Sequence, residues 1–177
     1  MKDFVTNAYV LRTTPSRDYD KTAHLFTEDF GRIEARVVSG RKILSKFSPH
    51  IEPTQKVVVR LAKRNGFTIT DVLSCNSSEY IKKDYTNFIN ILKSFSIIHF
   101  LAPKEIKDNS LWQLLQRMDA TGNIDPRETL SCLGYNIHHA SCDICGSNFI
   151  VGFNIFSHEF VCIGCAEKFP ESRIVIL

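Results

Sequence analysis

Four cysteines in the last quarter of the chain constrain its fold more than any other feature. They form two Cys-x-x-Cys pairs with 16 residues between them, Cys142 with Cys145 and Cys162 with Cys165. A Cys-x-x-Cys sequence in a tight turn directs two sulfurs at one point, and four thiolates suit the tetrahedral geometry of Zn²⁺. Four sulfurs would fill every position on the ion and leave none for water or substrate. The spacing therefore predicts a structural Zn²⁺ site that folds a segment too small to fold alone.

Other roles for these thiols receive less support from the sequence. The first residues, MKDFVTNAYVLRTT, lack the apolar run of a signal peptide, and no apolar stretch is long enough to span a bilayer. We therefore expect a soluble cytoplasmic protein, in a reducing compartment where disulfides are rare. A redox pair would need a βαβ context that is absent. His138, His139 and His158 are alternative metal ligands, and Cys75 and Cys132 are expected to be small buried hydrophobic residues.

Residues 1–75 have the pattern of a β-domain. Apolar and polar residues alternate cleanly in segments such as RIEARVV (32–38), and Asn65-Gly66 is a strong hairpin signal. Five strands in so short a region must close up to hide their edges, so we predict a small five-stranded barrel. The predicted strands cover residues 8–14, 21–27, 32–38, 56–64 and 67–73.

Residues 76–135 change to a helical period. A first helix is predicted from an N-cap at Ser78 to Pro103, with an apolar stripe made by Ile81, Tyr85, Phe88, Leu92 and Phe95. Two shorter helices are predicted over 110–120 and after the cap at Asp125. The chain then carries the cysteines and a terminal strand over 173–177. The fold class is therefore α+β, with a barrel at 1–76, a central helical domain at 77–135 and a zinc module at 136–177.

Positive charge is concentrated in the predicted barrel. Residues 1–75 carry 13 Lys and Arg against 8 Asp and Glu, whereas residues 141–177 carry 2 against 4. Five-stranded barrels often bind nucleic acids through cations that follow the phosphates and rings that stack on bases. Phe30, Phe47 and Phe67 are better explained as core residues, so we expect sequence-tolerant binding that weakens steeply with salt. The predicted nucleic-acid face comprises Arg32, Arg36, Arg41, Lys42, Lys46, Arg60, Lys63 and Arg64.

No catalytic constellation is recognisable in the sequence. A Walker-type glycine loop, a Gly-x-Ser-x-Gly sequence and a His-Glu-x-x-His sequence are all absent. We therefore predict a protein that is not an enzyme. Three alternatives stay open: an RNA- or ribosome-associated protein that pairs a barrel with a zinc ribbon, an adaptor for an acidic protein, and a zinc enzyme with an open metal position.

The order of these parts resembles the RecO family of recombination mediators. The resemblance is carried by LFTEDFGRIEARVVSGRKILSKFSPHIEP (25–53), TLSCLGYNIHHASCDICG (129–146) and FVCIGCA (160–166). It implies an N-terminal OB-fold, a helical domain and a four-cysteine zinc module. It also implies a cytoplasmic, nucleoid-associated protein that binds single- and double-stranded DNA, anneals complementary strands and works with RecR to load recombinase.

The same resemblance implies contact with the acidic tail of single-stranded DNA-binding protein. This chain ends soon after its second cysteine pair, whereas many members of the family continue into further helices. The expected contact with single-stranded DNA-binding protein therefore has less support than the expected contact with RecR, which the resemblance places largely on the barrel.

Overall fold

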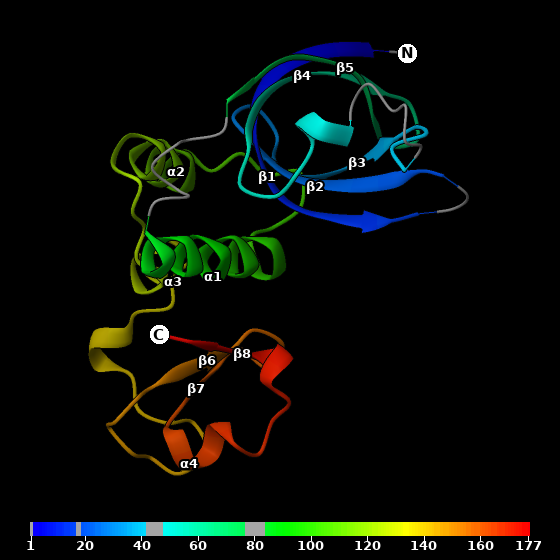
Figure 1. The fold of residues 1–177 in the computed structure, drawn as a ribbon. Coiled ribbons are helices and arrows are strands. Elements are labelled where there is room, and N and C mark those ends of the chain that lie inside the picture. The colour runs from blue at the N-terminus through cyan, green and yellow to red at the C-terminus, as the bar shows by residue number, and fades with distance from the viewer. Residues whose placement is uncertain (1, 17–18, 42–47, 77–83) are drawn as a thin grey trace.

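The protein has three packed parts that follow the order of the chain (Figure 1). The structure is a computed structural model that describes residues 2–16, 19–41, 48–76 and 84–177. A β-barrel comes first, three helices follow, and a small sheet beside the four cysteines comes last. The predicted α+β fold class is confirmed. Among the described residues, no helix is long and apolar enough to cross a membrane.

Five strands form a closed barrel, as the sequence predicts. Their order around the barrel is β1-β2-β3-β5-β4, and a parallel pairing of β3 with β5 closes the ring while the other pairs are antiparallel. Ile33, Ala35 and Val37 point into the core and Glu34 points out, as the alternation in the sequence indicates. The strands are β1 (Lys2–Pro15), β2 (Lys21–Thr27), β3 (Gly31–Val37), β4 (Lys56–Lys63) and β5 (Phe67–Asn76).

Strand β1 is longer than the segment 8–14 predicted for it, because each of its halves has its own partner. Lys2–Tyr9 pairs with β4 and Ala8–Pro15 pairs with β2, with a shift of register between Val10 and Arg12. Such an irregularity bends a strand and lets it pass from one side of a barrel to the other. The first half of β1 is rich in polar residues, so the sequence pattern gave no sign of it.

Helix α1 (Tyr85–Leu101) begins six residues later than predicted, with its N-cap at Asp84 and not at Ser78. The Asp84 side chain caps it by accepting hydrogen bonds from two backbone N–H groups of the first turn. The predicted cap, Ser78, and the stripe residue Ile81 lie outside the described residues. The predicted stripe is also wrong in part, because Tyr85 is 78% exposed. The helix instead buries two faces, one against the barrel side and one against the C-terminal sheet.

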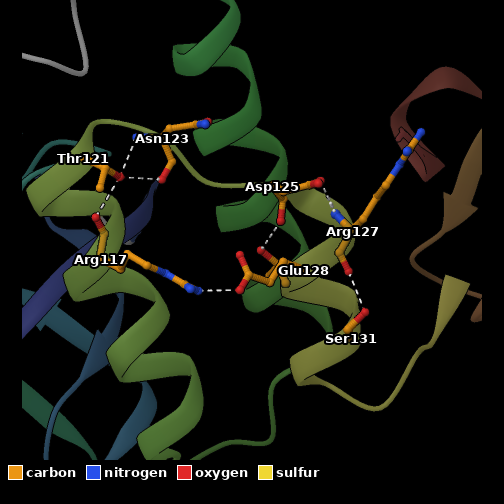
Figure 2. Close-up of polar contacts among 8 residues, drawn as sticks. Arg117, Thr121, Asn123, Asp125, Arg127, Glu128 and Ser131 are labelled. Atoms are coloured by element: carbon orange, nitrogen blue, oxygen red, sulfur yellow. Dashed lines mark hydrogen bonds and ion pairs between the residues drawn. The ribbon is translucent and has the colours of Figure 1, made fainter. Parts of the chain in front are cut away.

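Helices α2 (Asn109–Thr121) and α3 (Pro126–Cys132) pack beside α1, close to their predicted positions. α2 buries an apolar face and ends at Gly122, whose φ of 72° is left-handed. Figure 2 shows how α3 is fixed: Asp125 accepts a hydrogen bond from the Arg127 N–H, and Glu128 pairs with Arg117 of α2.

The C-terminal part is a three-stranded antiparallel sheet in the order β7-β6-β8. One face packs on α1 and α3 through Phe153 and Val175, and the other face covers the cysteines through Val161 and Ile174. The terminal strand predicted over 173–177 is present. The elements are β6 (Gly152–Asn154), β7 (Glu159–Val161), α4 (Ile163–Ala166) and β8 (Ile174–Ile176), with 3-10 turns at Ser48–His50, Ile137–His139 and Glu171–Arg173.

The segment between α1 and α2 is bound to the outside of the barrel at β3. We call residues 102–107 the strap. The Arg32 Nε donates to the Ala102 carbonyl at 2.6 Å, and the Glu105 N–H donates to the Arg32 carbonyl at 2.8 Å. Lys104 forms a β-bridge with Arg32 and an ion pair with Glu34 at 2.6 Å. Because β3 pairs with β5 only from Ala35 onward, the strap covers the part of β3 that β5 leaves free.

Two histidines face each other where α1 meets the barrel. The rings of His24 on β2 and His99 on α1 are 4.6 Å apart and nearly perpendicular. Burial lowers the pKa of both, and for His99, with the charges of His24 and Arg32 adding to the effect, the pKa falls to about 4. Glu34 on β3 opposes these shifts, while Arg12 on β1 adds to them. Both rings are therefore neutral in the folded protein near neutral pH.

Acidification is expected to weaken this junction. The unfolded chain protonates His24 and His99 near pH 6.5, whereas the folded protein resists protonation of His99 until about pH 4. The unfolded state thus binds more protons as the pH falls through this window, and stability falls with it. Since His99 is only half buried, we expect its share of the loss to be about 1–2 kcal/mol. Urea unfolding from pH 7 to pH 4.5 measures the loss, and His99→Gln should remove that share. An unchanged pH dependence in His99→Gln would contradict this account.

Candidate functional site

The four cysteines predicted as metal ligands come together in space. Their sulfurs all lie within 4.8 Å of one another, and the Sγ atoms of Cys145 and Cys162 are 3.6 Å apart. All four are free thiols. Such a group of sulfurs could hold a metal ion, and tetrahedral Zn²⁺ is the ion that four thiolates suit best. The predicted convergence of the two pairs is confirmed.

Local backbone structure holds the sulfurs in this arrangement. The Cys142 N–H donates to the Ser147 carbonyl at 2.7 Å, and Gly146 closes the turn at a φ of 73°, where a left-handed backbone favours glycine. Desolvation acts to raise the pKa of the Cys142 thiol, but backbone N–H groups that point at its sulfur outweigh this effect and lower the pKa to about 6. Burial and the neighbouring sulfurs act the other way on Cys165 and raise its pKa to about 12, so one thiol of the cluster ionises readily while another keeps its proton until a metal displaces it.

The histidines named as alternative ligands do not join the sulfur cluster in the described part of the chain. The His158 Nδ1 is hydrogen-bonded to the Tyr135 hydroxyl at 2.7 Å. His138 and His139 lie along a groove of about 680 Å³ beside α3. Cys75 and Cys132 are half-buried, and burial raises the pKa of each thiol. These last two residues are therefore packing residues, near the role expected for them.

Part of the predicted nucleic-acid face forms one surface on the barrel. Arg36 and Arg64 line the same groove, of about 430 Å³, where β3 pairs with β5 and where the β4–β5 hairpin turns. Thr68 and Thr70 also line it, and the Thr70 hydroxyl donates to the carbonyl of Arg60 on β4. We call this depression, lined by Arg36, Arg64, Thr68 and Thr70, the β3–β5 groove, and Arg60 is exposed on the neighbouring strand β4.

Two of the predicted cations are held by carboxylates. Arg36 binds Asp20 through Nε and Nη2, each at 2.6 Å from Oδ2, and this pair fixes the guanidinium beside the groove. Lys63 pairs with Glu105 of the strap at 2.5 Å, and its Nζ lies 4.5 Å from the centre of the Phe67 ring.

The remaining residues predicted for the nucleic-acid face are not found in the β3–β5 groove among the described residues. Arg32 holds the strap, and burial lowers the pKa of its guanidinium, so we leave it out of the proposed nucleic-acid surface. Arg41 is exposed and its N–H donates to the Tyr19 carbonyl. Lys42 and Lys46 lie outside the described residues. The rings of Phe30 and Phe67 are tilted by 49° with their centres 5.4 Å apart, and both residues pack against the barrel core, as expected, whereas Phe47 lies outside the described residues.

Comparison with known proteins identifies the family. Residues 1–80, which include the whole barrel, match the family described as Recombination protein O N terminal. A DNA repair protein RecO of Dehalococcoides mccartyi strain BAV1 is 26% identical over 177 residues, which cover 92% of this chain and 70% of the relative. A DNA repair protein RecO of Thermodesulfovibrio yellowstonii is 23% identical over 183 residues, with 96% and 72% covered. The barrel therefore matches the RecO N-terminal family, and the chain as a whole is similar to RecO proteins. The barrel is accordingly the OB-fold expected of a RecO protein, and that prediction is confirmed.

The sequence pattern did not single out several polar residues that the structure places at these sites. Thr68 and Thr70 line the β3–β5 groove, and their only signal was an outward position on an alternating strand. Glu105 gave no signal at all, because its contact with Lys63 joins residues 42 positions apart. The groove beside α3 was also missed, since its lining comes from α3 and from the linker that carries His138 and His139.

Proposed function

We propose that this protein is a DNA repair and recombination mediator that binds single- and double-stranded DNA and anneals complementary strands without catalysis. The observation that carries the proposal is the β3–β5 groove, where Arg36 and Arg64 line one depression and Arg60 lies on the neighbouring strand. OB-folds bind oligonucleotides on the face of strands 2 and 3 and with the loop between strands 4 and 5, and the groove is bordered by β3 and by the β4–β5 hairpin. Cations there neutralise phosphates on two strands and lower their mutual repulsion, so that complementary bases can pair.

The proposal includes the partners that the similarity to RecO proteins suggests. RecR would contact the barrel, and single-stranded DNA-binding protein would contact the chain through its acidic tail, so that recombinase can be loaded in the cytoplasm at the nucleoid. Zn²⁺ on the four cysteines would serve the fold and not the chemistry, since four thiolates fill a tetrahedral ion. A strand-annealing assay with and without RecR and single-stranded DNA-binding protein tests activity and partnership together.

Replacing Arg60 and Arg64 with alanine is expected to lower the affinity for DNA and to make that affinity less dependent on salt concentration. Each arginine that leaves a phosphate lowers the slope of log K against log salt by about 0.7 for a single strand, so Arg60→Ala/Arg64→Ala should lower it by about 1.4. Fluorescence anisotropy of a labelled single strand at several salt concentrations measures the slope.

The matched control for this pair removes two cations far from the barrel. Lys93→Ala/Lys168→Ala changes a residue of α1 and one that follows α4, and should leave the slope unchanged. An unchanged slope in Arg60→Ala/Arg64→Ala would remove both arginines from the DNA surface. A strong preference of the wild-type protein for RNA of matched sequence would favour the RNA-binding alternative.

A further inference from the structure

Lys63 is a cation of the predicted face that pairs with a carboxylate from outside the barrel. Its Nζ lies 4.5 Å from the centre of the Phe67 ring, and Phe67 lines the β3–β5 groove. The same Nζ is 2.5 Å from the Glu105 Oε2. Both side chains are open to solvent, with 40% of Lys63 and 52% of Glu105 exposed. Neither residue lines the groove itself, but the contact of Lys63 with Phe67 places the solvent-exposed ion pair next to it, where a phosphate could reach the lysine.

The backbone presents the Glu105 carboxylate at a fixed place. The Glu105 N–H donates to the Arg32 carbonyl at 2.8 Å, and the preceding Lys104 is bridged to Arg32 and paired with Glu34. Glu105 itself has a φ of 57°, in the left-handed region that residues other than glycine seldom adopt. Such a conformation persists only where the surrounding structure imposes it. The carboxylate is thus held beside Lys63 by the strap and does not merely reach it by chance.

We propose that Glu105 competes with DNA phosphate for Lys63 and so sets the affinity of the β3–β5 groove; this inference rests on the proposed DNA binding. A phosphate that binds Lys63 competes with the Glu105 carboxylate, because the single positive charge of the ammonium cannot neutralise two anions. Once displaced, the carboxylate stays near the groove on its strap and repels neighbouring phosphates. The Phe67 ring continues to support the freed lysine through a cation–π contact.

The size of the effect follows from the exposure of the pair. An ion pair open to solvent contributes little, so its removal should change DNA affinity only about two- to fivefold. A competitor of this strength keeps binding reversible without preventing it. Because Lys63 would then neutralise a phosphate without opposition, the salt slope should also rise by up to about 0.7.

The test is the affinity of Glu105→Gln for a labelled oligothymidine, measured by anisotropy over a series of salt concentrations. We expect the dissociation constant to fall about two- to fivefold and the slope to steepen. Glu128→Gln is the matched control, since Glu128 is also an exposed carboxylate paired with a cation, on α3 away from the barrel (Figure 2). It removes the same charge and should change affinity by less than Glu105→Gln does.

A double-mutant cycle with Lys63→Gln tests whether the effect passes through the lysine. Glu105→Gln should gain much less affinity when Lys63 is already neutral, because only the repulsion of neighbouring phosphates is then relieved, and an equal gain in that background would overturn the proposal. Glu105→Asn is a second variant that should also bind more tightly, because asparagine tolerates the left-handed backbone at this position. Equal affinities for wild type, Glu105→Gln and Glu105→Asn would overturn the inference while leaving the proposed function intact. Failure of the wild type to bind DNA at low salt would overturn both.

Discussion

Replacing Gly31 with alanine is expected to destabilise the protein by about 3 kcal/mol or more. A Cβ at this position would lie 1.8 Å from the Ile106 carbonyl oxygen and 2.6 Å from its carbon. Both atoms belong to the backbone of the strap, so neither can move away as the end of a flexible side chain would. Gly31 also has a φ of 62°, which costs an L-residue about 1 kcal/mol. Overpacking against backbone adds about 1–3 kcal/mol, and together these exceed the effect of an ordinary substitution.

Gly134→Ala separates the two causes in the same urea unfolding experiment. Gly134 also has a positive φ, of 93°, but an added Cβ there meets no atom within 4 Å. We therefore expect Gly134→Ala to lose only about 1 kcal/mol, which is the backbone cost alone. Equal losses for the two variants would show that the strap does not press on Gly31.

The strap also shows where prediction from sequence stops. The pattern predicts a turn ending at Gly31, and that turn is present between β2 and β3. The pattern cannot show that residue 31 must also be glycine for a second reason. The backbone of Ile106, 75 positions further along the chain, packs directly against Gly31 and leaves no room for a Cβ. The prediction that Arg32 faces DNA overlooked a similar long-range contact. The sequence shows an outward-pointing arginine on a basic strand, but it does not show that the carbonyl of Ala102, 70 positions away, accepts a hydrogen bond from it.

The barrel strands and the cysteine cluster could be predicted because their signals are local. Alternation reports which residues of β3 face the core, and a Cys-x-x-Cys sequence reports its own turn. The nucleic-acid surface was harder, because a list of cations does not say which carboxylates bind them. Asp20 and Glu105 reach Arg36 and Lys63 from other elements, and only the folded chain brings them there.

Helix α1 illustrates a related failure. The sequence shows a single apolar stripe, but the helix lies between two cores and must bury residues on both sides. Phe95 packs toward the barrel while Ile97 packs toward the C-terminal sheet. A hydrophobic period of 3.6 residues identifies a single buried face of a helix. A helix that packs between two layers has two buried faces, so its apolar residues do not follow that period alone.

Loss of metal is expected to unfold the cysteine module, the largest effect that the structure predicts. The module's sheet has three strands of three residues each, and such a small sheet buries too little apolar surface to be stable alone. Structural Zn²⁺ contributes on the order of 10 kcal/mol in small zinc-folded peptides. We expect one Zn²⁺ per chain in the purified protein by elemental analysis. Cys142→Ser, or treatment with a strong chelator, should remove the ion and expose the module to hydrogen exchange and protease.

The barrel should survive this loss, because its core is built from its own strands and shares no residue with the sulfur cluster. Hydrogen exchange should therefore rise from about residue 141 onward and stay unchanged in β1 to β5. Cys132→Ser is the matched control: its thiol is half-buried on α3 outside the cluster, and the metal content should stay at one ion. A protein whose module keeps its protection after complete metal removal would show that packing against α1 and α3, through residues such as Phe153, is sufficient without the ion.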